Sequence, residues 1–125
     1  MKNLLLLVLL LVGGSPQSFA EEPLDVSMIN LIATPNNFDG KLVRVSGYLN
    51  IEFESMELYL HKEDCVQGLT KNGVWLGLDR EARRKFDSMK LHYVLVEGVV
   101  DSTHFGHMGA TSATLTKIQR VQRLH

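Results

Sequence analysis

The sequence of 125 residues lacks the motifs that would assign it a reaction. It contains no Gly-x-Ser-x-Gly elbow, no Walker phosphate-binding loop, no His-Glu-x-x-His pattern and no pair of cysteines. Its acidic residues are scattered, whereas a metal-dependent nuclease needs clustered carboxylates and arginines that face a phosphate. We therefore expect no enzymatic activity and no cofactor.

Cysteine is also nearly absent. Cys65 is the only one in the chain, so no intramolecular disulfide can form. The acidic neighbours Glu63 and Asp64 disfavour a thiolate at this position. We expect a packed or idle thiol rather than a reactive one.

An excess of positive charge is missing as well. There are 13 Lys and Arg against 14 Asp and Glu, and loss of Lys2 with an N-terminal leader takes the formal net charge from −1 to −2. Proteins that bind nucleic acid without sequence preference normally present a basic surface. Nucleic acid is therefore not the partner that we expect.

No hydrophobic run is long enough to cross a membrane. The run Leu4–Val12 has nine apolar residues, where a spanning helix needs about 20. Lys2 before it and Ser18-Phe19-Ala20 after it complete the pattern of a signal peptide over residues 1–20. We expect an exported protein, periplasmic or secreted, with no membrane attachment after cleavage and a single domain over residues 21–125.

The predicted domain is organised around one long strand. After the turn signal Asp39-Gly40, apolar residues alternate with polar ones and are expected to face the core: Val43, Val45, Leu49, Ile51 and Phe53. Gly47 lies on the same side, in the middle of a run about twice the usual strand length of about 5–6 residues. A missing side chain there favours a bend, and a long bent strand can serve two parts of a small barrel.

The remaining patterns predict two helices and four more strands. Ser27 and Asp79 are good N-caps for helices over residues 28–34 and 80–90. The strands are expected at 58–62, 74–79, 92–100 and 113–121, the last with a bulge because its apolar residues break strict alternation. Residues 54–57 are expected as a hairpin connection and residues 63–69 as a polar stretch that can hold one helical turn.

This order of elements is that of an OB fold. The expected class is mainly β, with a five-stranded OB-like barrel, an N-terminal helix and a second helix between strands three and four. The alternative is an open sheet covered by two helices. We favour the barrel because Gly47 and Gly98 both lie where barrel strands must coil.

Several stretches also carry the pattern of a known group of proteins: Leu31–Pro35, Phe38–Lys41, Val43–Leu49, Leu58–His61, Thr70–Leu76 and Gly106–Gly109. Together they resemble a family of small, mostly uncharacterised bacterial OB-like proteins. The resemblance extends over most of residues 21–125 and implies the same fold. It brings no catalytic assignment.

The outward face of the first three strands is expected to carry aromatic and basic side chains: Arg44, Tyr48, Tyr59, His61 and Trp75. In OB folds this face stacks bases or sugars, and the loops after strands one and four flank it. We expect ligand rings to stack on Tyr59 and Trp75, with hydrogen bonds from Arg44 and His61. The same aromatics also fit a packing role, because aromatic side chains are frequent in strands.

The loop 101–112 contains the closely spaced histidines His104 and His107. They are expected to hydrogen-bond to a ligand at one end of the aromatic face, where Gly106 lets the backbone approach closely. With His61 or His92 they would also form a metal site. The spacing is a weak signal for one, and we expect no bound metal.

The expected function is that of a noncatalytic binding module that recognises a small ligand, an oligomer or a protein partner. A basic groove lined with rings would favour this function. Two alternatives stay open: a protein-interaction domain of the inhibitor or immunity type, and a histidine-based metal-binding protein or enzyme. An exposed apolar patch or a homo-oligomer contact would favour the second function. Three convergent histidines or acids would favour the third.

Overall fold

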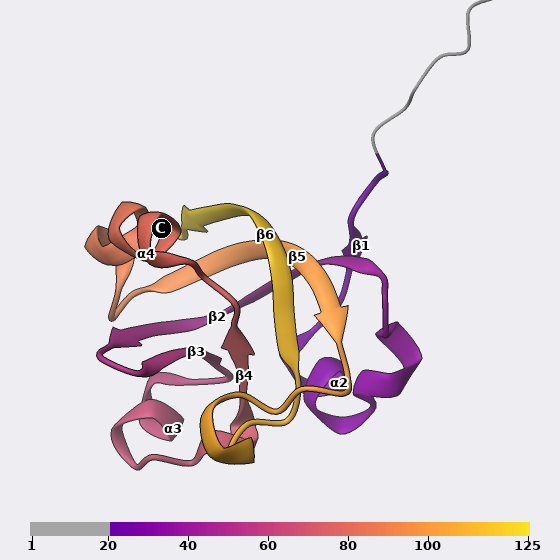
Figure 1. Cartoon of the computed structure of the whole chain (residues 1–125), viewed down its shortest axis with the longest axis horizontal. Helices are drawn as coiled ribbons and strands as arrows, with labels where there is room; N and C mark the ends of the chain where they lie inside the picture. The colour runs from indigo at the N-terminus through magenta and orange to yellow at the C-terminus, as the bar shows by residue number, and fades with distance from the viewer. Residues whose placement is uncertain (1–20) are drawn as a thin grey trace, which may run out of the picture.

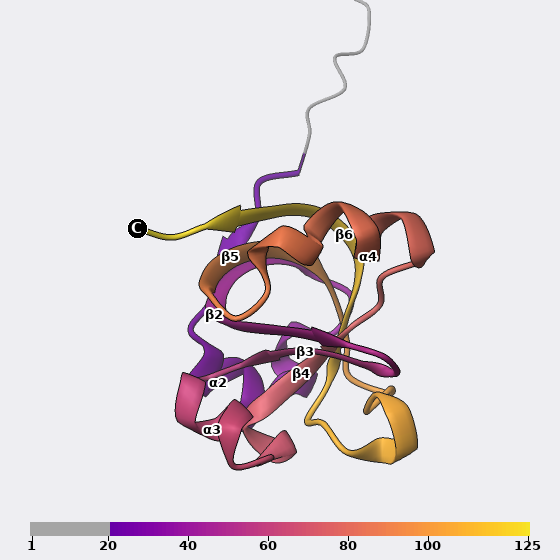
Figure 2. The ribbon, with the colours of Figure 1, turned by 90° about the vertical axis from the view of Figure 1, so that its left-hand side faces the viewer.

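The computed structural model describes residues 21–125, and the expected signal peptide, residues 1–20, lies outside the described residues. The described part is mainly β, with one mixed sheet of six strands and a few short helices (Figures 1 and 2). The strands are β1 (Leu24–Asp25), β2 (Leu42–Glu52), β3 (Ser55–Tyr59), β4 (Gly73–Leu76), β5 (Tyr93–Asp101) and β6 (Thr114–Arg123). Within residues 21–125, no helix has the length and apolar character needed to cross a membrane.

Short helices connect the strands: α2 (Met28–Ala33), α3 (Lys62–Val66), α4 (Arg80–Phe86) and the 3-10 segments η2 (Pro35–Phe38), η3 (Thr70–Asn72), η4 (Asp87–Met89) and η5 (His107–Gly109). The Ser27 hydroxyl caps α2 by accepting a hydrogen bond from the Asn30 N–H at 3.1 Å. The Asp79 carboxylate caps α4 in the same way, accepting from the Ala82 N–H at 2.8 Å. Helix α3 has five residues and lies in the polar stretch that was expected to hold at most one helical turn.

Strand β2 pairs with two different partners. Its first part, from Leu42 to Tyr48, pairs with β5, and its second part, from Tyr48 to Glu52, pairs with β3, both antiparallel. At the change of partner, a Cβ on Gly47 would lie 2.5 Å from the Tyr59 carbonyl oxygen and 2.8 Å from Leu58 Cγ. The prediction that one long strand serves two parts of the sheet is confirmed, and the missing side chain of Gly47 is what lets β3 approach.

The other pairings complete the sheet. They are β3–β4 antiparallel, β4–β6 parallel and β5–β6 antiparallel. Strand β1 adds in parallel to the start of β2, with Leu24 opposite Val43, and the Val26 N–H donates to the Arg44 carbonyl at 3.0 Å. The sheet therefore has six strands rather than the expected five, because residues 24 and 25 pair with β2.

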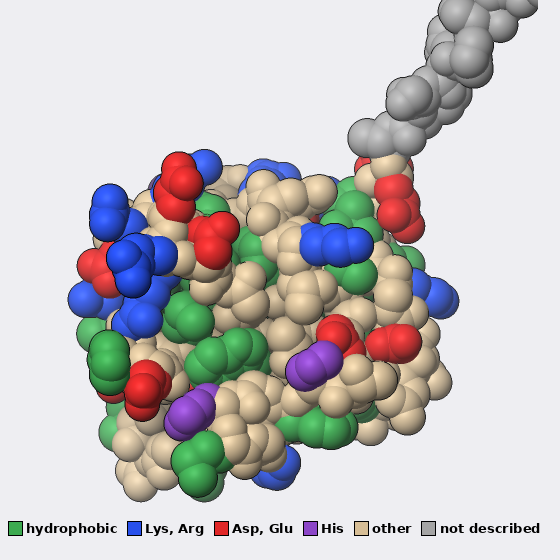
Figure 3. Space-filling model, in the orientation of Figure 1, with side chains coloured by type: hydrophobic (Ala, Val, Ile, Leu, Met, Phe, Trp, Pro, Cys, Tyr) green, Lys and Arg blue, Asp and Glu red, His purple; other side chains and the backbone are tan. Residues whose placement is uncertain are grey.

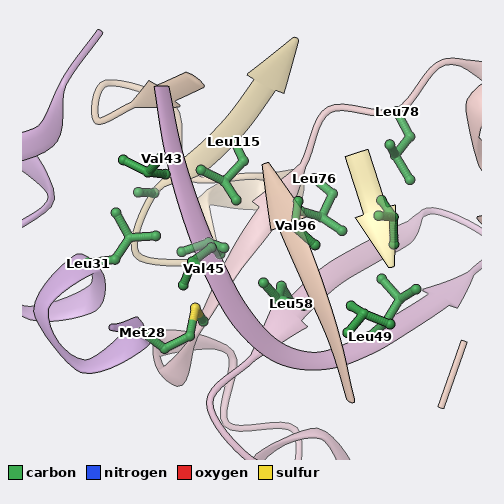
Figure 4. Close-up of a cluster of buried hydrophobic side chains, with 14 of the residues drawn as sticks. Met28, Leu31, Val43, Val45, Leu49, Leu58, Leu76, Leu78, Val96 and Leu115 are labelled. Carbon is green, nitrogen blue, oxygen red and sulfur yellow. The ribbon is translucent and has the colours of Figure 1, made fainter. Parts of the chain in front are cut away.

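The hydrophobic core is enclosed by α2, α4 and strands β2 to β6. Figure 4 shows its central side chains converging from these elements: Met28, Leu31, Val43, Val45, Leu49, Leu58, Leu76, Leu78, Val96 and Leu115. The expected inward residues of the long strand are buried, with one exception. Phe53 is 83 % exposed, because β2 ends at Glu52 and residues 53 and 54 form the turn into β3, with Glu54 at a φ of 63°.

The start of one strand differs from the prediction for an identifiable reason. Strand β3 begins at Ser55 rather than at residue 58. Polar side chains hold this segment against β2: Asn50 Nδ2 donates to Glu57 Oε1 at 2.8 Å, and the Ser55 hydroxyl donates to Glu57 Oε2 at 2.6 Å. The predicted irregularity in the last strand is confirmed by a register shift between β5 and β6 beside Gly98. There, a Cβ would lie 2.8 Å from Ile118 Cδ1.

Candidate functional site

The three predicted strand aromatics project from one face of the sheet. Tyr48 pairs with Tyr59, Tyr59 pairs with Gly73, and Trp75 lies two residues beyond Gly73 on β4. Residues that face each other across paired strands project from the same side, and so do residues two apart in one strand. The prediction that they share the outward face is confirmed, but the face is not uniformly open.

Helix α3 covers the part of the outer face that carries the tyrosines. It packs against β2 and β3, and Tyr48 and Tyr59 are only 6 % and 4 % exposed. The Tyr48 ring meets the Tyr93 ring edge-on, with centroids 5.2 Å apart. Burial, together with the nearby Glu57 carboxylate, raises the pKa of Tyr59 to about 12 and also raises the pKa of the Cys65 thiol on α3. Tyr59, which was expected to stack on ligand rings together with Trp75, is therefore buried, and both tyrosines fit the alternative packing role.

Arg44 lies on the same face, where two carboxylates hold it. Its Nε donates to Glu97 Oε2 at 3.0 Å, and its Nη1 donates to Asp25 Oδ1 at 3.2 Å. The buried Glu97 carboxylate also accepts from Gln119 and Arg120, at 3.1 and 3.0 Å. The hydrogen bond from Gln119, followed by those from the two arginines, keeps the pKa of Glu97 below its ordinary value although burial opposes this. Arg44 thus belongs to an ion-pair network, and it also lines a separate groove of about 450 Å³ together with Asp25, Ser46 and other residues.

His61 is not a strand residue. It precedes α3, and its backbone N–H donates to Asp64 Oδ2 at 2.9 Å, which fixes the start of that helix. Its side chain is exposed beside α3. The expected place of His61 on the aromatic face is therefore wrong.

One groove does bring predicted site residues together. It has a volume of about 350 Å³ and lies between β4, β6 and the β5–β6 loop (residues 102–113). Its lining contains three of the predicted residues and several others: Trp75, Gly77, Asp101, His104, Gly106, His107, Thr114 and Thr116. Figure 3 shows histidine side chains and hydrophobic surface on this side of the molecule.

Hydrogen bonds fix the β5–β6 loop. Within it, the Thr111 N–H donates to the Phe105 carbonyl at 2.8 Å. From outside, Lys71 Nζ on η3 donates to the carbonyls of Gly109 and Thr111, at 3.1 and 3.4 Å. The composition of this loop suggested flexibility, but these contacts give it a defined shape.

Gly106 places the backbone of the loop against the indole of Trp75. A Cβ at this position would lie 3.0 Å from Trp75 Cβ and Cε3 and 2.9 Å from Thr111 Oγ1. The residue also has a φ of 74°, in the left-handed region that favours glycine. The close backbone approach that was expected toward a ligand is thus made toward Trp75, which stays partly exposed in the groove.

Asp101 is the site residue that the sequence analysis missed. Its Oδ1 accepts from the Thr103 hydroxyl at 2.6 Å and from the Thr103 N–H at 2.9 Å, and its Oδ2 lies 2.7 Å from His104 Nδ1. The hydrogen bonds from Thr103, and then the one from His104, lower the pKa of Asp101 to about 2. Asp101 is therefore ionised at neutral pH, and His104 Nδ1 must carry the proton of this hydrogen bond. The Asp-x-Thr-His spacing is the signal that would have found it.

The histidines do not assemble a metal centre with their expected partners. Among residues 21–125, no group of three or more His, Cys, Asp or Glu side chains is arranged to hold a metal ion. His61 lies beside α3, and the Nδ1 atom of His92 lies 3.0 Å from the Lys90 carbonyl oxygen. Neither residue joins His104 and His107 in the groove.

The groove offers a ring face and hydrogen-bonding groups rather than an aligned nucleophile. The hydroxyls of Thr114 and Thr116 donate to the backbone carbonyls of His104 and Val99, at 2.9 and 3.3 Å. Neither hydroxyl therefore donates to an imidazole that would activate it. No protein family, curated protein or solved structure matches this chain.

Proposed function

We propose that the protein is a noncatalytic OB-like binding module whose ligand site is the groove between β4, β6 and the β5–β6 loop. The observation that carries the proposal is the partly exposed ring of Trp75 beside His104 and His107, under a loop of defined shape. A concave site with one aromatic wall and a few polar groups is typical of small-ligand binding. A loop that is already ordered loses little entropy when a ligand binds.

The OB-like part of the proposal is supported by the order of pairing. Strand β2 pairs with β3 and β5, and β4 and β6 complete the circuit between them. Helix α4 lies between β4 and β5 in the chain. This is the order expected of a five-stranded Greek-key barrel with one connecting helix, and in OB folds the long loops beside the sheet carry ligand contacts.

We further propose that the chain is exported to the periplasm or secreted. Lys2, the apolar run Leu4–Val12 and the small residues Ser18 and Ala20 support this. N-terminal sequencing of protein recovered from the producing cell should begin at Glu21. A mature chain that retains Met1 or Lys2 would contradict export by this signal.

Trp75 is the only tryptophan, so its fluorescence reports on the groove. We expect a screen of small ring-containing compounds to yield ligands that change this emission. Stacking contributes about 1–3 kcal/mol per ring, so Trp75→Ala should weaken binding of such a ligand by roughly tenfold or more. Because this variant is silent in fluorescence, its binding is measured by calorimetry.

A His104→Ala/His107→Ala double variant should weaken binding as well, whereas His92→Ala should not, because His92 lies outside the groove. The three variants are compared only after their circular dichroism spectra match that of the wild type. A ligand that binds the Trp75 and double variants as tightly as the wild type would exclude the groove as its site.

A protein-interaction domain is the second candidate function, and one observation favours it. Phe53 is 83 % exposed at the β2–β3 turn, and the Arg83 guanidinium of α4 donates to the neighbouring Glu52 carbonyl. Figure 3 shows Lys and Arg side chains gathered over α4 beside this turn. An exposed aromatic next to arginines is typical of an interface anchor. Light scattering tests this candidate for a homo-oligomer: a dimer mass lost in Phe53→Ser supports it, and a monomer in both proteins contradicts it.

A further inference from the structure

We propose that the groove binds a neutral sugar ring, that is, a polyhydroxylated ligand that donates hydrogen bonds, in preference to an anion or an amine. The inference rests on the proposed function, because it takes the groove as the ligand site. The inference depends on which polar atoms of the lining donate hydrogen bonds to a ligand and which accept them.

The two threonines of β6 present acceptors. The Thr114 hydroxyl donates to the His104 carbonyl at 2.9 Å, and the Thr116 hydroxyl donates to the Val99 carbonyl at 3.3 Å. A hydroxyl has one proton and two lone pairs. Once the proton is used internally, the oxygen can only accept from a ligand.

His104 presents an acceptor as well. Its Nδ1–H donates to the Asp101 carboxylate at 2.7 Å. In the neutral imidazole, the second ring nitrogen then carries a lone pair and no proton. In this neutral form the ring accepts at Nε2. The lining thus combines acceptors at Thr114, Thr116 and His104 with donors from the Trp75 indole and the His107 ring, and a sugar hydroxyl can pair with both kinds.

Such a lining disfavours phosphates and carboxylates. Anions are recognised most strongly by charged donors, and none of the described residues that line the groove is Lys or Arg. Lys71, next to the loop, directs its Nζ to the carbonyls of Gly109 and Thr111. The Asp101 carboxylate adds negative charge at the rim, which opposes an anion further.

An amine is disfavoured for a different reason. The only carboxylate of the lining, that of Asp101, already accepts three hydrogen bonds, two from Thr103 and one from His104. The lining supplies one aromatic ring, that of Trp75, and a cation–π contact at a partly exposed ring is weak. A sugar hydroxyl needs no partner of opposite charge. Each one can donate its single proton to one acceptor of the lining.

Trp75 completes the match to a sugar. The face of an indole is electronegative, and it attracts the C–H groups on the flat side of a sugar ring. The hydroxyls at the edge of such a ring would meet the acceptors of Thr114, Thr116 and His104. A single ring face with acceptors around it therefore fits a neutral saccharide better than either charged class.

The test is a binding comparison of trisaccharides that differ in charge. Chitotriose, cellotriose and maltotriose are neutral, fully deacetylated chitotriose is cationic, and trigalacturonate is anionic; adenosine monophosphate is added as an anionic ring that is not a sugar. Binding is read from Trp75 fluorescence and from backbone amide shifts. We expect at least one neutral trisaccharide to shift the amides of His104, Gly106 and Thr116, and to bind at least about tenfold more tightly than either charged trisaccharide.

A matched set of variants tests the acceptor argument. Thr116→Val keeps the shape but removes the oxygen, and should weaken binding of that trisaccharide about fivefold, the effect of one hydrogen bond. Thr116→Ser restores the hydroxyl and should recover most of the affinity that Thr116→Val loses. Thr70→Val, on η3 outside the groove, should also leave binding unchanged.

The outcomes separate the two proposals. If a charged probe shifts the groove amides and binds more tightly than every neutral trisaccharide, the sugar assignment is overturned while the groove remains a binding site. If no neutral trisaccharide shifts these amides, the sugar assignment is likewise overturned. If a neutral trisaccharide shifts amides only elsewhere on the protein, the proposed ligand site fails together with it.

Discussion

The outer face of the sheet has a covered part and an open part. Over β2 and β3, helix α3 buries Tyr48 and Tyr59. Beside β4 and β6, the β5–β6 loop leaves Trp75 partly exposed. The two covers differ at their closest approach: α3 packs against both β2 and β3, whereas the loop approaches the indole with the backbone of Gly106, a residue without a side chain. A close approach without a side chain leaves room for a groove beside the ring.

Hydrogen bonds fix both α3 and the β5–β6 loop in place, but only the loop borders the groove that contains Trp75. Asp64 holds α3, because its Oδ2 accepts from the His61 N–H and its Oδ1 accepts from Asn72 Nδ2, both at 2.9 Å. Lys71 holds the β5–β6 loop through two of its carbonyls. A charged side chain thus fixes each cover through two hydrogen bonds. One cover lies over buried rings, and the other lies beside the groove.

The largest expected difference between the covered and the open part is in the loss of stability when an aromatic ring is removed. Tyr59→Ala removes a buried ring and should lower the free energy of unfolding by about 3–5 kcal/mol. Trp75→Ala removes a ring that is already partly in water and should lower it by about 1–2 kcal/mol. Urea denaturation measures both. Equal losses in the two variants would mean that the loop buries its aromatic ring as fully as α3 does.

A smaller effect separates the two close backbone approaches. Gly47→Ala places a methyl 2.5 Å from the Tyr59 carbonyl oxygen between two paired strands, and should cost about 3 kcal/mol of unfolding free energy. Gly106→Ala must displace a loop at a φ of 74°, and should cost about 1–2 kcal/mol. It should also shift the Trp75 emission, because the methyl presses on the indole.

Gly77→Ala is the control for both glycine variants. A methyl there would meet its neighbours at 3.5–3.8 Å, which is ordinary contact, and stability should change by less than about 1 kcal/mol. A Gly106→Ala protein that is as unstable as Gly47→Ala would show that the loop is part of the cooperative core.

The faces of the strands were predictable from sequence, but the covers were not. Alternation alone placed Val45 inward and Trp75 outward, because side chains in a strand have a period of two. Helix α3 has no apolar stripe from which it could be predicted, since residues 62–66 are Lys-Glu-Asp-Cys-Val. Its place depends on tertiary contacts with β2 and β3 and on Asn72, which lies outside the helix. Because the sequence did not place this helix over the sheet, it could not distinguish buried tyrosines from tyrosines exposed to a ligand.

The site was predictable where its residues are local. Trp75 and the two loop histidines, which strand alternation and loop composition single out, line one groove. The ion pair of Arg44 was not predictable, since its partner Glu97 lies 53 residues away in sequence. Phe53 was assigned to the core because the two-residue turn that exposes it has no glycine or proline to announce it.

The smallest predicted effect concerns Asp101, at the rim of the open part. The Thr103 hydroxyl makes the largest contribution to the low pKa of this carboxyl, through a hydrogen bond of 2.6 Å. Thr103→Val removes it and keeps the backbone N–H. The pKa of Asp101 should therefore rise from about 2 toward its ordinary value of 3.8, which an NMR titration of the carboxylate measures. Thr70→Val, far along the chain on η3, should leave that pKa unchanged.

The sign of the accompanying pH dependence follows from the same shift. The folded pKa of Asp101 lies below the unfolded one, so its contribution to stability is fully present above about pH 4 and is lost as the pH falls through about 2. Because the carboxyl is exposed, this loss should be small in the wild type, and smaller still in Thr103→Val. A pKa that stays near 2 in Thr103→Val would contradict the assigned role of the Thr103 hydroxyl. It would show that the hydrogen bonds from the Thr103 N–H and from His104 are enough to lower the pKa of Asp101.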